Sequence, residues 1–204
     1  MTRLLILVLA AALQMGTFRP ARVTSSPFAG FPYGSRAAGI VVLDVDVDAR
    51  GTVRGINTVK DLDPFGDAVR SAVSSWRFEP ARSGGQAVEH PILVTALIRP
   101  AMVMFPAPPP PPPPPADAPT SIPFPIEIGI PAYPANRVGT AAVLVEVEID
   151  DRGSVTAAKI KGETTGFDDA SMDAARRWVF RPAEHQNRDV PSRGYLLFIY
   201  RQPA

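Results

Sequence analysis

Three carboxylates stand two residues apart in the stretch LDVDVDARGTV, at Asp44, Asp46 and Asp48. Closely spaced oxygen ligands suit hard cations such as Ca²⁺, so the stretch raises the question of a metal site. A calcium loop of the EF-hand type needs glycine at its sixth position, where this chain has Ala49. The intervening valines also favour a strand over a loop. We therefore predict no metal site here.

The acids alternate with apolar residues, and the stretch VEVEIDDRGSV repeats the arrangement with Glu146, Glu148 and Asp150. Alternation with a period of two is typical of a strand that is buried on one face. We therefore expect all six acids to lie on the solvent faces of two strands, where charge keeps the strands soluble and discourages edge pairing.

The similarity extends over both halves of the chain. A shift of 102 positions superposes about seventy residues without a gap, which is strong evidence of an internal duplication. The shift places many identical residues on one another, among them Pro32 on Pro134, Gly51 on Gly153, Phe65 on Phe167, Trp76 on Trp178 and Phe78 on Phe180.

Each repeat has the same order of predicted elements. A first strand ends at a turn containing Gly51 or Gly153, where glycine can take the positive φ of a short hairpin, and a second strand returns. Apolar residues at helical spacing then predict a helix, with Asp67 or Asp168 as its N-cap. A Trp-x-Phe-x-Pro-Ala segment ends the helix, and a last strand, ILVTALI or YLLFIY, closes the unit.

The predicted fold class is therefore α+β, with two β-β-α-β units that are each a small antiparallel sheet with one packed helix. We interpret Trp76 and Trp178 as core anchors, because a tryptophan on the apolar face at a helix end more often fills a core than lines a ligand pocket.

Proline usage divides the chain. The chain has 24 prolines, and a continuous run of them lies in PAPPPPPPPPADAP at residues 106–119. Such a run favours polyproline II and acts as a semi-rigid spacer. We assign residues 29–99 to the first domain, 100–130 to a proline-rich linker and 131–204 to the second domain.

The N-terminal residues 1–21 form a signal peptide or a short membrane segment. Arg3 precedes an unbroken apolar run from Leu4 to Leu13, which suits the core of a signal peptide better than a span of about 20 residues across a bilayer. Ala10-Ala11-Ala12 offers small residues for cleavage. Both interpretations imply export of the chain, which is released if the segment is cleaved and remains attached to the membrane if it is not.

Composition excludes several classes of function. The formal charge of +1 lacks the basic excess of a nucleic-acid-binding protein, and the absence of cysteine excludes disulfides, thiolate nucleophiles and cysteine metal sites. The only histidines, His90 and His185, stand in no known zinc or nucleophile motif. We expect no enzyme activity, no catalytic residue and no cofactor.

Arg176, Arg177 and Arg181 surround Trp178 and have no basic equivalents in the first repeat. Two interpretations remain open for them. They either contact an acidic partner or, in the case of Arg176 and Arg177, complement the dipole at the C-terminal end of the helix.

The second half resembles the C-terminal domain of the TonB family. The resemblance rests on PAYP before a strand, DDRGSV at the turn, and TTGFDDASMDAARRWVFRPA over the helix and its stop. The first half matches more loosely, with FP in place of Tyr-Pro and SSWRFEPA in place of the Arg-Arg-Trp segment. Two features differ from typical transducers, since the prolines separate two domains here and no long membrane helix with a histidine is present.

The resemblance implies a periplasmic protein of Gram-negative bacteria that binds a short segment of an outer-membrane receptor, or of another envelope protein, as a strand added beside its last strand. That strand corresponds to the partner-binding residues Tyr195, Leu196, Leu197, Phe198, Ile199 and Tyr200. Both alternating sets of this strand are apolar, so one set needs a cover, which a receptor peptide, a second molecule or Ile92–Ile98 of the first repeat can supply.

Two functions follow. In the first, the protein binds peptide segments by strand addition, in TonB-dependent transport. In the second, it is a non-transducing scaffold in which the two repeats form an internal pseudo-dimer.

Overall fold

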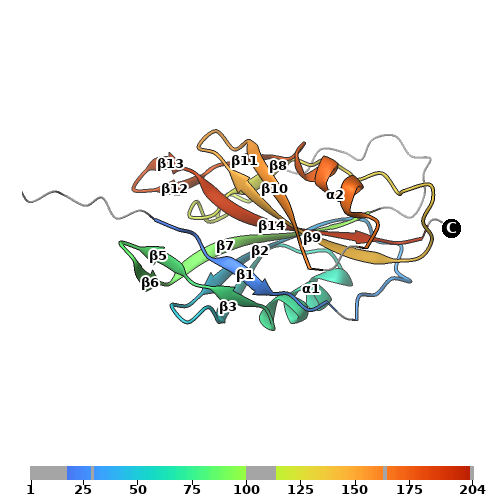
Figure 1. Cartoon of the computed structure of the whole chain (residues 1–204), viewed down its shortest axis with the longest axis horizontal. Helices are drawn as coiled ribbons and strands as arrows, with labels where there is room; N and C mark the ends of the chain where they lie inside the picture. Colours follow the sequence, from blue (N-terminus) through green and yellow to red (C-terminus); the bar gives the residue numbers. More distant parts are fainter. Residues whose placement is uncertain (1–17, 29, 100–113, 163–164, 203–204) are drawn as a thin grey trace, which may run out of the picture.

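A six-stranded sheet is the centre of the computed structural model, which describes residues 18–28, 30–99, 114–162 and 165–202. The first repeat supplies β2 (Gly39–Val47), β3 (Val53–Lys60) and β7 (His90–Ile98), and the second supplies β9 (Ala141–Ile149), β10 (Val155–Lys161) and β14 (Ser192–Tyr200). The strand order is β10-β9-β14-β7-β2-β3 (Figure 1). Each predicted domain thus contributes three strands to one sheet, and the prediction of two small separate sheets is wrong, although the α+β class is confirmed.

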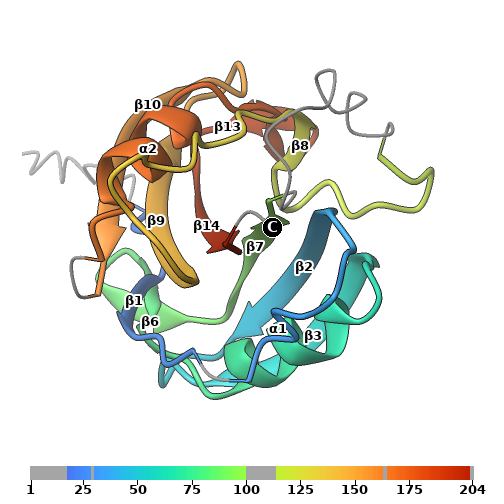
Figure 2. The same ribbon diagram turned by 90° about the vertical axis from the view of Figure 1, so that its right-hand side faces the viewer.

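The two halves of the sheet have the same internal order. From either edge toward the centre, the second, the first and the last long strand of one repeat follow one another. The two repeats meet where β14 pairs with β7 in parallel, whereas the pairs within each repeat are antiparallel. Figure 2 shows these two strands at the middle, with the first repeat on one side and the second on the other. Equivalent residues of β7 and β14 face opposite sides of the sheet, so an approximate two-fold axis runs along the two strands.

The two helices cover opposite faces of the sheet. Helix α1 (Phe65–Ser74) buries Phe65, Val69 and Val73 on one face, and α2 (Asp168–Ala175) buries Ala174 and Ala175 on the other. The N-caps are Pro64 and Phe167, with no side-chain capping bond, so the prediction that Asp67 and Asp168 are N-caps is wrong.

The N-caps differ from the prediction because each helix begins earlier relative to its acid. Asp67 lies inside the first turn of α1, where its charge still complements the helix dipole. Asp168 is the first residue of α2, and its carboxylate accepts hydrogen bonds from the backbone N–H groups of Thr165 and Gly166.

Short strands extend each repeat beyond the predicted unit. β1 (Arg22–Ser25) pairs with β4 (Arg77–Glu79), and at equivalent positions β8 (Phe124–Glu127) pairs with β11 (Val179–Arg181). Two hairpins follow, β5 (Ala81–Ser83) with β6 (Gln86–Val88) and β12 (Ala183–His185) with β13 (Arg188–Val190). The second repeat therefore begins inside the predicted linker 100–130, and most of the proline run lies outside the described residues.

The two predicted hairpin turns are confirmed, and the last acid of each series builds its turn. The carboxylate of Asp48 accepts bonds from the N–H groups of Arg50 and Thr52, and that of Asp150 does so from Arg152 and Ser154. These bonds lower the pKa of Asp48. Gly51 has φ +80°, and a Cβ there would lie 1.8 Å from the carbonyl oxygen of Phe78, so the position needs glycine for its conformation and for space.

Residues 18–21, which the sequence assigns to the N-terminal segment, pack on the fold. The backbone of Arg19 exchanges two hydrogen bonds of 2.8 Å with Arg82, and Ala21 is fully buried. Within the described ranges, neither helix is long and apolar enough to cross a membrane.

Candidate functional site: the paired last strands

The last strand of the second repeat lies in the interior of the sheet. β14 pairs with β9 from Ser192 to Tyr200 on one side and with β7 from Gly194 to Ile199 on the other. All six residues predicted to bind a partner, Tyr195 to Tyr200, have at most 1% of their surface exposed. Both edges of the strand are therefore occupied by strands of the same chain.

The sequence YLLFIY suits this position because both faces of β14 are buried. Tyr195, Leu197 and Ile199 join the core beneath α1, and Leu196, Phe198 and Tyr200 join the core beneath α2. The cover that this doubly apolar strand requires is thus the first repeat, which is the third of the three covers expected from the sequence.

β7 is buried in the same reciprocal way. Ile92, Val94, Ala96 and Ile98 face the core of its own repeat, whereas Leu93 and Leu97 face the core of the second repeat. Each repeat therefore completes its core with side chains from the last strand of the other, as in a dimer with a shared sheet.

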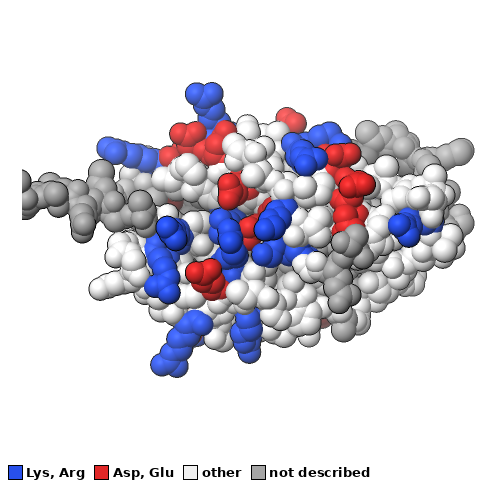
Figure 3. Space-filling view, viewed as in Figure 1, with Lys and Arg blue, Asp and Glu red and all other residues white. Residues whose placement is uncertain are grey.

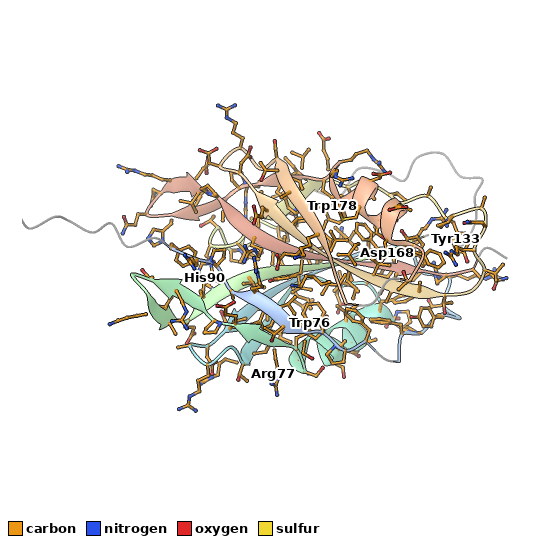
Figure 4. All side chains as sticks on the ribbon, in the orientation of Figure 1. Trp76, Arg77, His90, Tyr133, Asp168 and Trp178 are labelled. Carbon is orange, nitrogen blue, oxygen red and sulfur yellow. The ribbon has the colours of Figure 1, made fainter. Side chains whose placement is uncertain are left out.

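The two tryptophans anchor these two cores. Trp76 and Trp178 are at most 1% exposed and lie on opposite sides of the central strands (Figure 4). The indole N–H of Trp178 donates to the carbonyl of Gly129 at 2.9 Å, whereas the N–H of Trp76 has no partner within the described ranges. The interpretation of both as core anchors is confirmed.

Tyr195 ties the N-terminal strand to the second repeat. Its hydroxyl accepts a bond of 2.8 Å from the N–H of Val23 and lies 3.2 Å from both the carbonyl oxygen of Ala21 and a carboxylate oxygen of Glu146. Burial, and then the charge of Glu146, raise the pKa of the tyrosine well above its usual value. The phenol therefore remains neutral and links β14, β9 and β1.

Glu146 departs from the prediction that the acids lie on solvent faces. It is only 5% exposed, because β1 and Tyr195 cover it, and the side chains of Arg22, Lys161 and Arg193 each approach its carboxylate to 3.9 Å. Figure 3 shows basic and acidic side chains interspersed near the middle of this side of the molecule. The buried carboxylate is thus part of an ionic network between the repeats, in which Arg22 is half exposed.

The equivalent acid in the first repeat, Asp44, has a different environment. It is partly buried, and one of its carboxylate oxygens has no hydrogen-bond partner within the described residues. Burial and then the neighbouring Asp46 raise the pKa of Asp44 to about 6. The positions equivalent to Tyr195 and Arg193 are Leu93 and Pro91, which explains why no comparable network forms.

Two equivalent arginines cross between the repeats at the other end of the central strands. Arg99 donates from Nε to the carbonyl of Pro131 at 2.9 Å and lies over the ring of Tyr133. Arg201 donates to the carbonyl of Ser35 and lies over the ring of Phe65. Each arginine directly follows the last strand of one repeat and contacts the other repeat.

The arginines near Trp178 mostly contact the protein's own backbone. Arg177 donates to the carbonyls of Asp173 and Ile130, and Arg181 donates to the carbonyl of Pro119 at 2.6 Å. Arg176 forms an exposed ion pair with Asp173. Contact with the last carbonyls of α2 agrees with the dipole interpretation for Arg177.

The outer strands β3 and β10 are the edges of the sheet. Among the described residues each has one partner strand, β2 or β9. Both pairings contain register shifts, and Lys60, Lys159 and Lys161 stand on these strands. Bulges and lysines are the usual protection of an edge against further pairing.

No cluster of three or more histidine, cysteine or acidic side chains within the described ranges is arranged to hold a metal ion. The central strands instead form an interface. Backbone hydrogen bonds between them and apolar side chains on both of their faces hold the two equivalent repeats together.

The comparison with known families agrees with this duplicated architecture. The sequence profile described as Gram-negative bacterial TonB protein C-terminal matches residues 34–97 and again residues 131–201, about two thirds of the chain. The chain therefore belongs to the family of TonB C-terminal domains, present as two repeats. The family is one of TonB-like envelope proteins that act in transport. No curated protein matches the chain.

Proposed function

We propose that the protein acts in envelope transport as a closed TonB-like module, a non-transducing scaffold in which the repeats form an internal pseudo-dimer. The pairing of β7 with β14 is the observation that carries the proposal. It supports the second of the two functions derived from the sequence, because the strand edge that the family resemblance assigns to a receptor peptide is occupied by the first repeat.

Strand addition at Tyr195–Tyr200 would require the repeats to separate. A peptide that replaced β7 could restore the backbone hydrogen bonds of β14. It would not restore the contacts of Leu93 and Leu97 with the second core or of Leu197 and Ile199 with the first. Because burial of each such side chain contributes about 1.5–3 kcal/mol, the closed pair is the favoured state.

The proposal places the module in the periplasm, where the run from Leu4 to Leu13 directs export or attachment. Its partners are outer-membrane receptors or other envelope proteins, engaged through surfaces other than the last strands. It assigns no catalytic step and no cofactor to the protein.

A disulfide that locks the two last strands tests the proposal. Thr95 and Leu196 are neighbours in the β7–β14 register and face the same core, and the natural chain has no cysteine. Thr95→Cys combined with Leu196→Cys should therefore form a single bridge between the repeats in the oxidising periplasm. The two single variants are the matched controls.

The readout is complementation of a strain that lacks the protein. We expect the locked variant to complement as well as the single variants do, because the working state is the closed one. If the locked variant fails while both single variants complement, the repeats must open during function, and the scaffold proposal is wrong in favour of strand addition.

A further inference from the structure

A cavity of about 590 Å³ lies at the end of the molecule that carries the two hairpins, and both repeats line it. In Figure 1 the hairpins β5–β6 and β12–β13 lie at the same end of the molecule, at the left, one below the other. The volume falls within the range that small organic ligands occupy. The apolar part of its wall includes Phe18, Pro20, Pro91, Pro123, Val190 and Pro191.

The polar part of the wall contains two pairs of equivalent positions, and in each pair one repeat has histidine where the other has serine. His90 is equivalent to Ser192, and Ser83 is equivalent to His185. All four line the cavity, so each repeat contributes one imidazole and one hydroxyl to a single space. Figure 4 shows His90 on the side of the molecule toward the hairpins.

The polar groups that face this space are mainly hydrogen-bond acceptors. Glu89 and Glu184 supply carboxylates, and the buried hydroxyl oxygen of Ser192 has no partner within the described residues. Burial, and then the charge of His185, lower the pKa of His90, which keeps its imidazole neutral near pH 7 with one acceptor nitrogen.

The two terminal nitrogens of the Arg193 guanidinium, which also lines the wall, are already engaged. The terminal nitrogens of Arg193 donate to the carbonyls of Pro20 and Ala21 and to the carboxylate of Glu148, at 3.3 to 3.5 Å. Prolines contribute no N–H donors. The cavity therefore offers acceptors and negative charge beside an apolar wall.

We propose that this cavity is a binding site for a small organic amine with an aromatic or aliphatic body. The ammonium group donates hydrogen bonds to the carboxylate of Glu184 and the hydroxyl of Ser192, and the apolar body lies along the prolines. Phe18, whose ring packs edge-on against His90 with centroids 4.8 Å apart, closes one side of the site.

The charged and titratable groups that line the cavity set its pH dependence. Glu89 and Glu184 attract a cation, whereas His90, His185 and Arg193 repel it when charged. Protonation of His90 replaces an acceptor with a donor and adds positive charge. Amine binding should therefore be stronger at pH 8, where His90 is neutral, than at a pH low enough to protonate it.

Titration of the full chain with phenethylamine, followed by proton NMR, tests the proposal. The chain has only two histidines, so the imidazole proton signals report on the cavity directly. We expect both signals to shift saturably with phenethylamine at pH 8 and to remain unchanged with 3-phenylpropionate, an anion of similar size. Glu184→Gln should weaken amine binding about threefold or more, and Glu127→Gln, an exposed acid outside the cavity, should leave it unchanged.

Three results would overturn the proposal. They are the absence of any saturable shift with the amine, equal binding of the anion, and equal behaviour of Glu184→Gln and Glu127→Gln. Circular dichroism of both variants distinguishes a lost site from a lost fold.

Discussion

Arg201 donates two hydrogen bonds, of 3.3 and 3.0 Å, to the backbone carbonyl of Arg99, its own equivalent in the first repeat. The two residues stand 102 positions apart, at the ends of strands that run in parallel. Both are at most 8% exposed, and burial lowers the pKa of each guanidinium without neutralising it near pH 7. The pair fastens the ends of β7 and β14 together.

Replacement of Arg201 by alanine should therefore loosen the contact between the repeats. The change removes the bonds that Arg201 donates to the carbonyls of Arg99 and Ser35, and the loss of buried bonds to a charged group should cost about 2 kcal/mol of unfolding free energy. Denaturant unfolding measures the loss. Arg176→Ala, at an exposed ion pair, is the control and should change stability by less than about 0.5 kcal/mol. Equal effects of the two substitutions would contradict this account of Arg201.

The two tryptophans give a matched pair of core substitutions. Trp178→Ala should cost about 3–5 kcal/mol, because it empties a buried volume. Trp178→Phe should cost about 1 kcal/mol more than Trp76→Phe, since only Trp178 donates a hydrogen bond that the smaller ring cannot replace. Thermal melts compare the variants. A larger loss for Trp76→Phe would show that the bond to Gly129 contributes little.

Asp44 should reduce stability above pH 6. Its pKa of about 6 in the folded protein exceeds the usual value near 4, so the unfolded chain releases the proton first as the pH rises. Stability from this group is therefore full only below about pH 4 and is lost as the pH rises through about 6. Asp44→Asn should raise stability by about 1 kcal/mol at pH 8, after allowance for solvent screening, and leave it nearly unchanged at pH 4.

Urea unfolding at the two pH values measures the effect, with the exposed Asp151→Asn as control. A gain at pH 8 no larger than that of the control would show that Asp44 is solvated well enough to ionise without penalty.

The packing of residues 18–23 sets a limit on processing of the N-terminus. Ala21 and Val23 are buried, and the hydroxyl of Tyr195 bonds to the backbone of both. Cleavage after residue 21 would remove part of this contact, so the mature chain should begin at or before Phe18, which the small residues Ala10 to Ala12 permit. Intact mass spectrometry of the protein from its native host decides, and a mature chain that starts beyond Ala21 would contradict the expectation.

Local pattern was enough to predict much of each repeat. Alternation around Val45 and Val147 identified the first strands, and Gly51 and Gly153 marked turns that their φ values and close carbonyl contacts require. These features depend on near neighbours in the sequence. The helix ends were less well predicted, because Pro64 and Phe167 occupy the cap positions without any side-chain bond.

The relationship between the repeats depends on contacts between residues about one hundred positions apart, which period and propensity do not report. Glu146 and Asp44 illustrate this, since the same strand pattern gives an ionic network in one repeat and, in the other, a partly buried carboxylate of which one oxygen has no partner among the described residues. β8 was not predicted, because it lies in the proline-rich segment 100–130 that was assigned to the linker. The doubly apolar YLLFIY was the one local sign of the shared sheet, because a strand apolar on both faces needs a cover on both.

Hydrogen exchange at the backbone amides of Tyr195 to Tyr200 tests the central claim most directly, that the last strands of the two repeats occupy each other. In the protein alone, the amides of β14 that donate to β7 or β9 should be protected to nearly the free energy of global unfolding, because the strand is paired on both sides. An added envelope-protein peptide should leave their exchange unchanged. Rapid exchange of these amides in the protein alone, followed by protection when the peptide is added, would show instead that β14 is an open edge waiting for a partner strand.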